Sequence, residues 1–551
     1  MSHDRRMMSF PLSITHLLER GRALFPGVEV VSRRADKSLV RHSYADLYVG
    51  AEKLARALAR LGVKHGERVA TLCWNHKEHL ECYLGVPAMG AVVHTLNLRL
   101  HPDEIAYIVN HAADAVMVLD RTLLPLFEKI RRRIPTVRHV LVVRDDGGAV
   151  PEGLLDYQTL LDAETVAKHA PGMMTPEGSP FSLRDENEAA MICYTSGTTG
   201  NPKGVAFTHR STVLHAMALS MRDMIGVGAD DVMLPVVPMF HAAAWGMPYA
   251  SVMNGAKVVF PGPHLDPTSL LDLMEAEKVT IAAGVPTIWI GILALLDQHP
   301  KRWDLSKMRS MVIGGSAAPP ALIRGFAERH GLEVTHAWGM TELNPLGTLA
   351  RVTPTIRARG VEAEFAARAS QGIPAPYVEI RHAGDAGQHL DWDGTSMGEL
   401  EVRGPWVAAS YVGDDGPDRF TADGWFKTGD VVTIDGDGYV RITDRSKDVV
   451  KSGGEWISSV ALENALMGHP AVLEAAVFGA RHPRWDERPV AAIVLKPGAT
   501  ATSEELENFL EPKFAKFWMP DRYLFVAAIP RTSTGKFLKS KLREDHGDVL
   551  M

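Results

Sequence analysis

The run 69-VATLC-73 is a short, continuous apolar stretch, which is typical of a strand buried in a sheet. A helix pattern precedes it, with apolar residues at helical spacing from Leu47 to Leu58 and Ser43 at the expected N-cap. The same order returns in the strand-containing run 83-YLGVPAMGAVVHTLN-97, the helix candidate 102-PDEIAYIVNHA-112 and the strand candidate 115-AVMVL-119. This alternation predicts an α/β fold with a largely parallel sheet.

Length and composition restrict the possible classes of protein. The chain has 551 residues, more than one core usually holds, so at least two domains are expected. Hydrophobic residues make up 46% and charged residues 23%, a balance that argues against disorder. The formal charge of −7 gives no general attraction to nucleic acid, so no such partner is expected. Cys73, Cys82 and Cys193 have no CxxC spacing and fit a reducing, cytoplasmic location.

Two segments bear on membranes. The first twenty residues contain charges but no continuous apolar region, so a secretory signal is not expected. Residues 279–296 carry no charge over eighteen positions, which reaches the length of a membrane span. Gly284, Pro286 and Gly291 interrupt this run, so a buried strand, a turn and a helix start are predicted instead.

The sequence changes character near residue 430. Turn-forming Gly and Asp separate short β-rich pieces, and about a hundred residues follow, enough for a small α+β domain. The expected elements are a helix at 458–469, strands at 471–480 and 489–496, and a second helix at 503–517. We place the boundary at Asp444 to Lys447, which divides the chain into residues 1–444 and 445–551.

The strongest chemical signal is 191-MICYTSGTTGNPKGVAFTHRS-211. Its hydroxyls, glycines and following lysine suit the binding of a polyphosphate by a donor-rich loop. These residues are Thr195, Ser196, Gly197, Thr198, Thr199, Gly200 and Lys203. The loop lacks the Walker spacing, because five residues after Gly197 stands Pro202. Taken alone, the pattern also fits a surface turn. Elsewhere, His76 and His79 lack a metal-binding pattern, so no zinc site is expected there.

These residues resemble the phosphate-binding signature of the adenylate-forming superfamily, which includes acyl-CoA synthetases, luciferases and adenylation domains. Four further motifs resemble the family in the same order. They are HAWGMTE at 336–342, TGD at 428–430, DRSKDVVKSGGEW at 444–456 and PRTSTGK at 530–536. The segments 237–250 and 451–470 resemble the branch of bacterial medium- and long-chain fatty-acid CoA ligases. The resemblance implies a large N-terminal domain and a small mobile α+β C-terminal domain.

The resemblance also implies an ATP site. The loop would wrap the phosphates, with Glu342 and Thr195 holding Mg²⁺, because charge that develops on phosphates has to be neutralised. Trp338 would stack on adenine, Asp430 would accept the ribose hydroxyls, and Arg445 would help hold ribose or phosphate. The other nucleotide-binding residues implied are Gly315, Ser316, Ala317, Gly339, Met340 and Thr341.

Two half-reactions are implied. Lys536 would stabilise the transition state of adenylation, acting with Glu342, Thr195 and His241. The C-terminal domain would then turn about Lys447 and bring a second face to the site for coenzyme A. That face contains Gly453, Gly454, Glu455 and Trp456. Lys451 and Arg488 are also candidates for phosphate contacts.

The acid itself is the open question. His241 and Trp245, four residues apart, resemble a residue between the ATP and acyl sites and a gate to the acyl tunnel. An amino acid is disfavoured because His241 stands where an Asp would pair with its ammonium. Acetate is disfavoured because Gly339 stands where acetate-specific relatives carry Trp. The expected activity is therefore ATP-dependent, AMP-forming ligation of a medium- or long-chain carboxylic acid to coenzyme A.

Several alternatives stay open. Short sulfur-containing acids such as 3-methylthiopropionate and cinnamate-like aryl acids are also substrates within the family. A second alternative is an enzyme that stops at acyl-AMP and loads a carrier protein, and a third is a membrane fatty-acid transporter built on residues 279–296. Relatives often dimerise, so a homodimer is one expectation.

Overall fold

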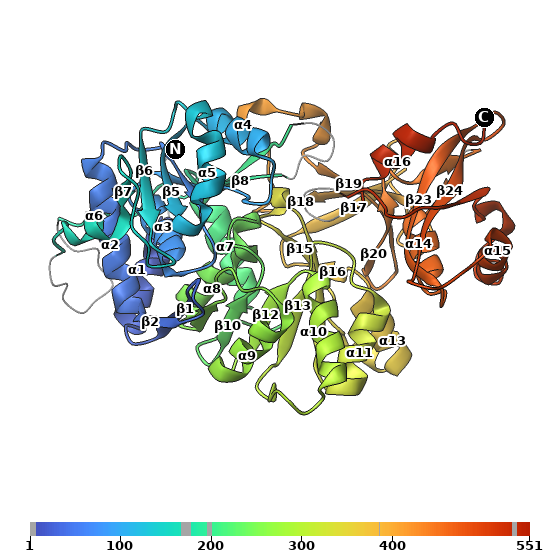
Figure 1. Ribbon diagram of the computed structural model, residues 1–551, viewed down its shortest axis with the longest axis horizontal. Coiled ribbons are helices and arrows are strands. Elements are labelled where there is room, and N and C mark those ends of the chain that lie inside the picture. The colour runs from blue at the N-terminus through green and yellow to red at the C-terminus, as the bar shows by residue number, and fades with distance from the viewer. Residues whose placement is uncertain (1–6, 167–177, 196–200, 385, 454, 532–536) are drawn as a thin grey trace. The chain divides into compact units, whose positions relative to one another are not determined.

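The computed structural model describes the chain apart from residues 1–6, 167–177, 196–200, 385, 454 and 532–536. It has two compact units, Met1–Val378 with Gly404–Pro417, and Glu379–Arg403 with Asp418–Met551 (Figure 1). The larger unit contains two mostly parallel sheets covered by helices, and the smaller contains antiparallel sheets. The α/β class with a small second domain is therefore confirmed. The functional boundary at 444–447 stays a prediction.

The first sheet of the larger unit has seven strands. In spatial order they are β7 (Leu155–Asp156), β6 (His139–Val143), β5 (Asp114–Asp120), β3 (Arg68–Leu72), β4 (Val92–Thr95), β8 (Ala189–Tyr194) and β9 (Gly204–Thr208). All neighbours are parallel except β8 and β9, which form an antiparallel hairpin. The run that begins at Val69 lies in the middle of this sheet, as its continuous apolar character predicts.

Helices cover both faces of the seven-stranded sheet. They are α1 (Ile14–Leu24), α2 (Tyr44–Arg60), α3 (Lys77–Ala88), α4 (Pro102–Ala112), α5 (Leu124–Ile130) and α6 (Tyr157–Asp162). Ser43 caps α2 through a capping box with Asp46, as its position in the sequence predicts. On one face, α4 and α5 pack through Ile105 and Phe127 onto Leu119 of β5 (Figure 1).

The second sheet has nine strands. In spatial order they are β16 (Ile373–Pro374), β15 (Leu346–Leu349), β14 (Val334–Gly339), β13 (Ser310–Ile313), β12 (Ile281–Gly284), β10 (Val232–Pro235), β11 (Lys257–Phe260), β1 (Glu29–Arg33) and β2 (Leu39–Ser43). The strands from β14 to β1 are parallel, and β15, β16 and β2 are antiparallel additions at the edges.

A second set of helices accompanies this sheet. They are α7 (His209–Ser220), α8 (Met247–Asn254), α9 (Pro267–Glu277), α10 (Pro286–Gln298), α11 (Pro320–His330), α12 (Pro354–Arg357) and α13 (Val361–Ala369). Trp289 of α10 and Phe326 of α11 are fully buried in the core against the sheet. The apolar run 279–296 is thus a strand, a turn and a helix that begins at Pro286, as predicted.

The smaller unit contains two further sheets. One has the order β17 (Glu379–Ala383), β18 (Gly398–Arg403), β19 (Phe426–Ile434) and β20 (Val440–Arg445), all antiparallel. The other has the order β22 (Glu455–Ile457), β21 (Val450–Ser452), β24 (Asp486–Leu495) and β23 (Val472–His482), and β25 (Arg522–Phe525) joins β24 in parallel.

The helices of the smaller unit are α14 (Ser459–Met467), α15 (Ser503–Leu510) and α16 (Lys539–His546). The helix expected over 503–517 is shorter than predicted, because α15 ends at Leu510. Pro512 follows two residues later, and proline disfavours helical geometry in the residue before it. The strand and helix positions expected at 458–496 otherwise match α14, β23 and β24 to within a few residues at each end.

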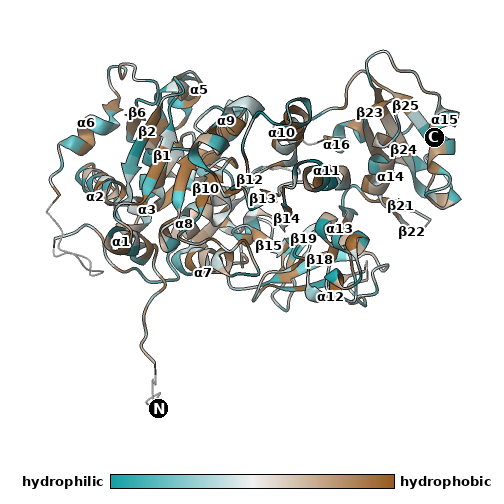
Figure 2. Ribbon diagram, turned by 90° about the horizontal axis from the view of Figure 1, so that it is seen from below, coloured by the Kyte–Doolittle hydropathy of each residue, from teal (hydrophilic) through white to brown (hydrophobic). Residues whose placement is uncertain are grey.

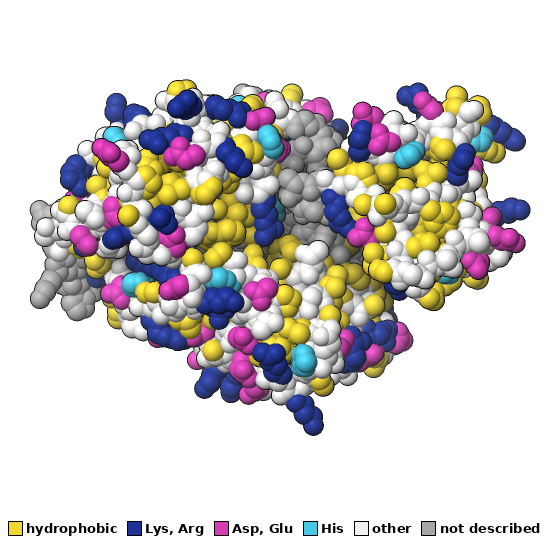
Figure 3. Space-filling view, viewed as in Figure 1, with side chains coloured by type: hydrophobic (Ala, Val, Ile, Leu, Met, Phe, Trp, Pro, Cys, Tyr) yellow, Lys and Arg dark blue, Asp and Glu magenta, His cyan; other side chains and the backbone are white. Residues whose placement is uncertain are grey.

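Hydropathy follows this layering, since apolar residues concentrate in the inner strands and on the inward sides of the helices (Figure 2). Basic and acidic side chains are interspersed over the face seen in Figure 3. Within the described part of the chain, no helix combines the length and the apolar character that crossing a membrane would need.

Candidate active site

The donor-rich loop connects β8 to β9. Its base is closed by two hydrogen bonds: Thr195 N donates to the Lys203 carbonyl oxygen at 2.9 Å, and Lys203 N donates to Thr195 Oγ1 at 3.1 Å. Loop residues Ser196, Gly197, Thr198, Thr199 and Gly200 lie outside the described residues. The two described ends of the predicted phosphate loop are thus held together at the carboxyl end of β8.

Tyr411, which the sequence motifs do not include, contacts both Lys203 and Glu342. The Lys203 Nζ atom lies 5.2 Å from the centre of the Tyr411 ring, and the Tyr411 hydroxyl donates to Glu342 Oε1 at 2.6 Å. Tyr411 and Glu342 are 3% and 5% exposed. The structure therefore brings the predicted phosphate-binding cation and the predicted metal-binding carboxylate together. Tyr411 is 69 positions from Glu342 in the sequence, so local patterns carry no signal for this contact.

Glu342 lies on a short 3-10 turn, Thr341–Leu343, that follows β14. Just before it, Gly339 pairs with Leu346 of β15, and Met340 N donates to the Pro345 carbonyl oxygen at 3.0 Å. A Cβ atom at Gly339 would lie 2.1 Å from that same oxygen. Glycine is therefore required here by the close approach of two backbones. Its lack of a side chain is not by itself a measure of acyl-pocket depth.

Trp338 is 6% exposed and lies over Gly347 of the facing strand, where a Cβ would come within 2.3 Å of its ring. Trp338 and Gly339 are the last two residues of β14. The adenine contact of Trp338 stays a prediction.

Gly315, Ser316 and Ala317 follow β13 and are exposed. The ring of Trp245 lies beside this segment, because a Cβ at Gly314 would lie 3.1 Å from it and one at Gly315 3.9 Å. The structure thus brings the predicted gate residue next to the predicted nucleotide-binding glycine segment.

Trp245 belongs to a backbone segment of unusual conformation, the 3-10 turn Ala242–Gly246. Ala242, Ala244 and Trp245 have φ angles of +36°, +49° and +56°, in the left-handed region that non-glycine residues rarely adopt. Such residues cost about 1–3 kcal/mol each and cluster at functional sites. The surrounding packing must therefore hold this segment in place.

His241 stands directly before this segment. It lines a small enclosed pocket together with Thr195, so two of the predicted catalytic residues share one cavity. The other lining residues are Thr95, Asn97, Leu100, Ile108, Tyr194 and Phe240.

The predicted ribose residues lie in the smaller unit. Asp430 of β19 and Arg445 of β20 are direct cross-strand partners, and Arg445 Nε lies 2.8 Å from Asp430 Oδ1. The Asp430 side chain is 1% exposed, whereas that of Arg445 is 44% exposed. Arg445 is thus positioned by its carboxylate partner, with much of its guanidinium side chain accessible.

Lys447, the predicted hinge, lies between two anchored residues. Asp444 Oδ2 accepts a hydrogen bond from Ser459 N of α14 at 2.5 Å, and Asp448 pairs with Arg543 of α16 at 2.8 Å. Partial desolvation lowers the pKa of Lys447 below its ordinary value. Its hinge role stays a prediction.

The predicted coenzyme A face is a hairpin. Lys451 of β21 pairs with Trp456 of β22, and its Nζ atom lies 5.0 Å from the centre of the indole ring. Gly453, at φ +57°, forms the turn. Gly454 and the side chain of Glu455 lie outside the described part of the structure.

Arg488 does not match its prediction as a phosphate contact. Its guanidinium is bonded within the protein, to Asp521 at 2.7 Å, to Ser452 Oγ and to the carbonyl oxygens of Phe517 and Met519. Only 7% of the residue is exposed. Arg488 therefore ties β24 to the segment before β25. Lys536 lies outside the described residues; next to it, Arg531 and Phe537 form a β-bridge.

The sequence predicts no zinc site at His76 and His79. The structure does bring ligand atoms of Cys73, His76 and Asp120 within 4.8 Å of one another. His76 Nε2 lies 2.8 Å from Asp120 Oδ1, and its Nδ1 lies 3.0 Å from Glu78 Oε2. Burial alone would lower the pKa of His76, but these carboxylates raise it to about 10. Carboxylates therefore lie close to both imidazole nitrogens of His76, and the backbone N–H of His79 also contacts its Nδ1 at 3.2 Å, so these described residues form a buried polar network.

Comparison with known proteins agrees with this arrangement. The family model described as AMP-binding enzyme matches residues 19–412, and the model described as AMP-binding enzyme C-terminal domain matches residues 461–536. The chain therefore belongs to the AMP-binding enzyme family, which confirms the resemblance seen in its motifs.

Two relatives and one solved structure give the similarity in detail. The chain is 47% identical to a long-chain-fatty-acid–CoA ligase of Thermus thermophilus, over 98% of this chain and 96% of that protein. It is 45% identical to a 3-methylmercaptopropionyl-CoA ligase of Ruegeria pomeroyi, over 99% of both. The crystal structure of the anthranilate CoA ligase AuaEII in complex with anthranoyl-AMP superposes with a TM-score of 0.82 at 26% identity, covering 98% of each chain.

Proposed function

We propose that this protein is an ATP-dependent, AMP-forming ligase that joins a medium- or long-chain carboxylic acid to coenzyme A through an acyl-adenylate. The observation that carries the proposal is the convergence of Lys203, Tyr411 and Glu342 beside the base of the phosphate loop, in a chain of the AMP-binding enzyme family. A cation and a carboxylate held together by a buried tyrosine suit a site for a nucleoside triphosphate.

In the first half-reaction a carboxylate oxygen of the acid attacks the α-phosphorus of ATP, and pyrophosphate leaves. The loop after β8 and Lys203 bind the phosphates, and Lys536 stabilises the charge that develops at the α-phosphate. In the second half-reaction the thiol of coenzyme A attacks the acyl carbon, forming the thioester and releasing AMP. Lys451 and Trp456 contribute to the coenzyme A side.

Magnesium belongs to the same proposal. Glu342 and Thr195 offer a carboxylate and a hydroxyl oxygen, the hard donors that Mg²⁺ prefers, so the donor set fits the ion. When bound, the ion would neutralise charge on the phosphates. A cytoplasmic location and a homodimer are also part of the proposal, and the mass of the purified protein in solution tests the dimer.

The choice of acid is tested with a panel. The two relatives described above are named for very different acids and are almost equally similar to this chain, so sequence identity alone does not indicate which acid it uses. We expect kcat/KM to rise about fourfold for each added methylene, up to the length at which the pocket ends. The panel runs from acetate to palmitate and includes 3-methylthiopropionate and cinnamate. An optimum at 3-methylthiopropionate or cinnamate would overturn the chain-length part of the proposal.

Replacing Tyr411 with phenylalanine removes the hydroxyl that holds Glu342 but keeps the ring under Lys203. We expect adenylation to slow about tenfold, because one hydrogen bond to a buried carboxylate is lost. Pyrophosphate release measures this rate. Tyr157→Phe is the matched control, since the Tyr157 hydroxyl also donates to a buried glutamate, Glu81, at 2.7 Å. Equal losses in both variants would contradict a specific role for Tyr411.

Replacing Trp456 with alanine removes the ring that faces Lys451. We expect thioester formation from supplied acyl-AMP to fall about tenfold or more, with adenylation much less affected, because the residue acts on the coenzyme A side. The two half-reactions are assayed separately. Equal losses in both would contradict this assignment.

A further inference from the structure

His215, on α7, is a buried histidine that no motif of the sequence includes. It is 1% exposed and touches two segments of the candidate site at once. Burial lowers its pKa to about 3, so the imidazole is neutral at any pH at which the protein would be assayed. A neutral imidazole has one nitrogen that accepts a hydrogen bond and one that donates.

The first segment that His215 touches is the start of β15. Its Nε2 atom accepts a hydrogen bond from Leu346 N at 3.3 Å. The carbonyl oxygen of the same residue accepts a hydrogen bond from Trp406 Nε1 at 2.9 Å, and the Trp406 and His215 rings meet edge to face with centroids 5.8 Å apart. Both polar groups of Leu346 are therefore fixed by side chains.

Leu346 matters because it pairs directly with Gly339, at the end of the strand that carries Trp338. The turn between them contains Glu342, and the same helix α7 holds that turn a second time, since Asn344 Nδ2 donates to Ser211 Oγ at 3.2 Å. The position of the nucleotide-side residues thus depends on contacts with α7.

The second segment that His215 touches is the left-handed turn that carries Trp245. A Cβ atom at Gly246 would lie 2.4 Å from His215 Nδ1 and 2.6 Å from Cε1, so the ring edge lies directly against this backbone. Gly246 has a φ of +71° and directly follows Trp245. The imidazole therefore packs against the backbone of the turn whose Trp245 ring lies beside Gly314.

We propose that His215 is a positioning residue for both substrates: its Nε2 side sets the strand pair that carries Trp338 and Glu342, and its Nδ1 side supports the turn that carries Trp245. This inference rests on the proposed function, because it assigns ATP to the first segment and the acid to the second. His215 touches neither substrate itself.

The test separates the two sides of the ring. Glutamine places its amide near Nε2 and asparagine near Nδ1, so each replaces one half of the imidazole. We expect His215→Gln to raise the KM for the acid about tenfold with little change for ATP, and His215→Asn to raise the KM for ATP about tenfold with little change for the acid. His215→Phe, which keeps a ring but has no acceptor, should raise both.

His209 provides a matched control on the same helix. It is also buried, its Nδ1 accepts a hydrogen bond from the backbone N–H of Ile14 at 3.2 Å, and burial lowers its pKa to about 4. We expect His209→Phe to lower the melting temperature and to leave both KM values unchanged within about twofold.

The outcomes are distinguishable. If the wild-type protein forms no AMP with any acid of the panel, the proposed function fails. If the wild type is active and the His215 variants show only a lower melting temperature, as His209→Phe does, His215 is a structural residue and the inference fails. If His215→Phe does not fold, the Gln and Asn variants still test the inference. A rise in the KM for the acid in the first and in the KM for ATP in the second supports it, and parallel changes in both variants contradict it.

Discussion

Alanine at position 536 is expected to slow acyl-adenylate formation by about 10²–10³-fold, because the lysine cation stabilises charge that develops only in the transition state. The same variant should convert supplied acyl-AMP and coenzyme A to thioester at a rate within about threefold of wild type, since its side chain acts in the first half-reaction only. Acid-dependent pyrophosphate release measures the first rate, and thioester formation from synthetic acyl-AMP measures the second.

Lys541→Ala is the control for the removal of one cation from this part of the chain. Lys541 lies on α16, is 44% exposed and pairs with two acidic residues of its own helix, so its loss should leave both rates unchanged. If Lys536→Ala lowers both half-reactions to the same extent, Lys536 does not act selectively in adenylation, and the alternation of two half-reactions at one site loses its main support.

Replacing Glu342 with glutamine is expected to lower the adenylation rate by about 10²-fold or more, because the variant keeps the acceptor for Tyr411 but loses the negative charge proposed to hold Mg²⁺. The Mg²⁺ concentration that gives half-maximal rate should rise as well. A titration of pyrophosphate release with Mg²⁺ gives both quantities. An unchanged Mg²⁺ requirement, with or without a loss of rate, would contradict the proposed role.

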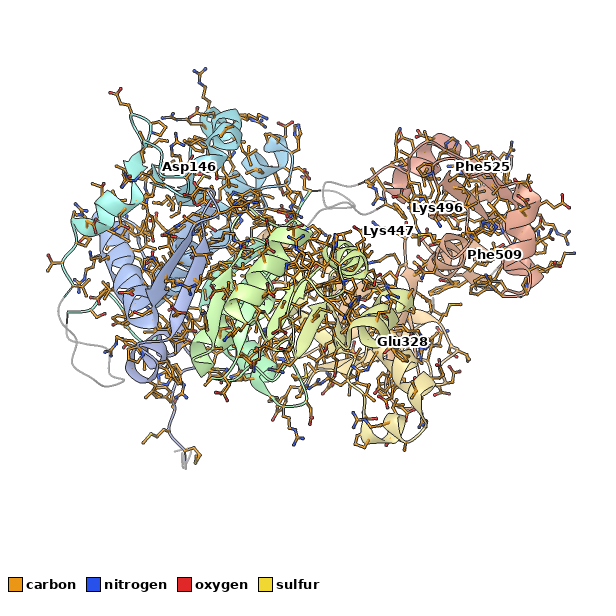
Figure 4. The ribbon with its side chains drawn as sticks, turned by 60° about the horizontal axis from the view of Figure 1, so that its bottom comes forward. Asp146, Glu328, Lys447, Lys496, Phe509 and Phe525 are labelled. Atoms are coloured by element: carbon orange, nitrogen blue, oxygen red, sulfur yellow. The ribbon has the colours of Figure 1, made fainter. Side chains whose placement is uncertain are left out.

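Glu328→Gln is the matched control for this charge change. Glu328 is an exposed residue of α11, visible in Figure 4, and it pairs with Arg324 of its own helix at 3.2 Å. A surface ion pair of this kind contributes little to stability, so we expect neither the rate nor the Mg²⁺ requirement to change.

Much of the fold could be predicted from local patterns. Ser43 begins α2 and Pro286 begins α10 because capping residues and proline act on the few residues around them. The end of α15 at Leu510 was predicted wrongly. The prediction followed the apolar periodicity beyond Pro512, although proline disfavours helical geometry in the residue before it.

The residues of the candidate site also differ in whether local sequence patterns reveal them. Trp338, Gly339 and Glu342 lie within one motif, so the sequence could single them out as candidates, and their roles stay predictions. Tyr411 and His215 could not be singled out, because their contacts with Glu342 and Leu346 exist only in the fold. Arg488 was a candidate for a phosphate contact because it is a basic residue near a motif. In the structure its guanidinium is instead bonded to Asp521 and to backbone carbonyl oxygens of its own unit.

The most direct test of the central claim is AMP release from ATP and octanoate, measured with and without coenzyme A. With coenzyme A, we expect many turnovers of AMP and an equal amount of acyl-CoA. Without coenzyme A, we expect about one equivalent of enzyme-bound acyl-adenylate and then no further reaction. Continuous acyl-adenylate release that does not respond to coenzyme A would contradict the ligase assignment and indicate that another acceptor, such as a carrier protein, takes the acyl group.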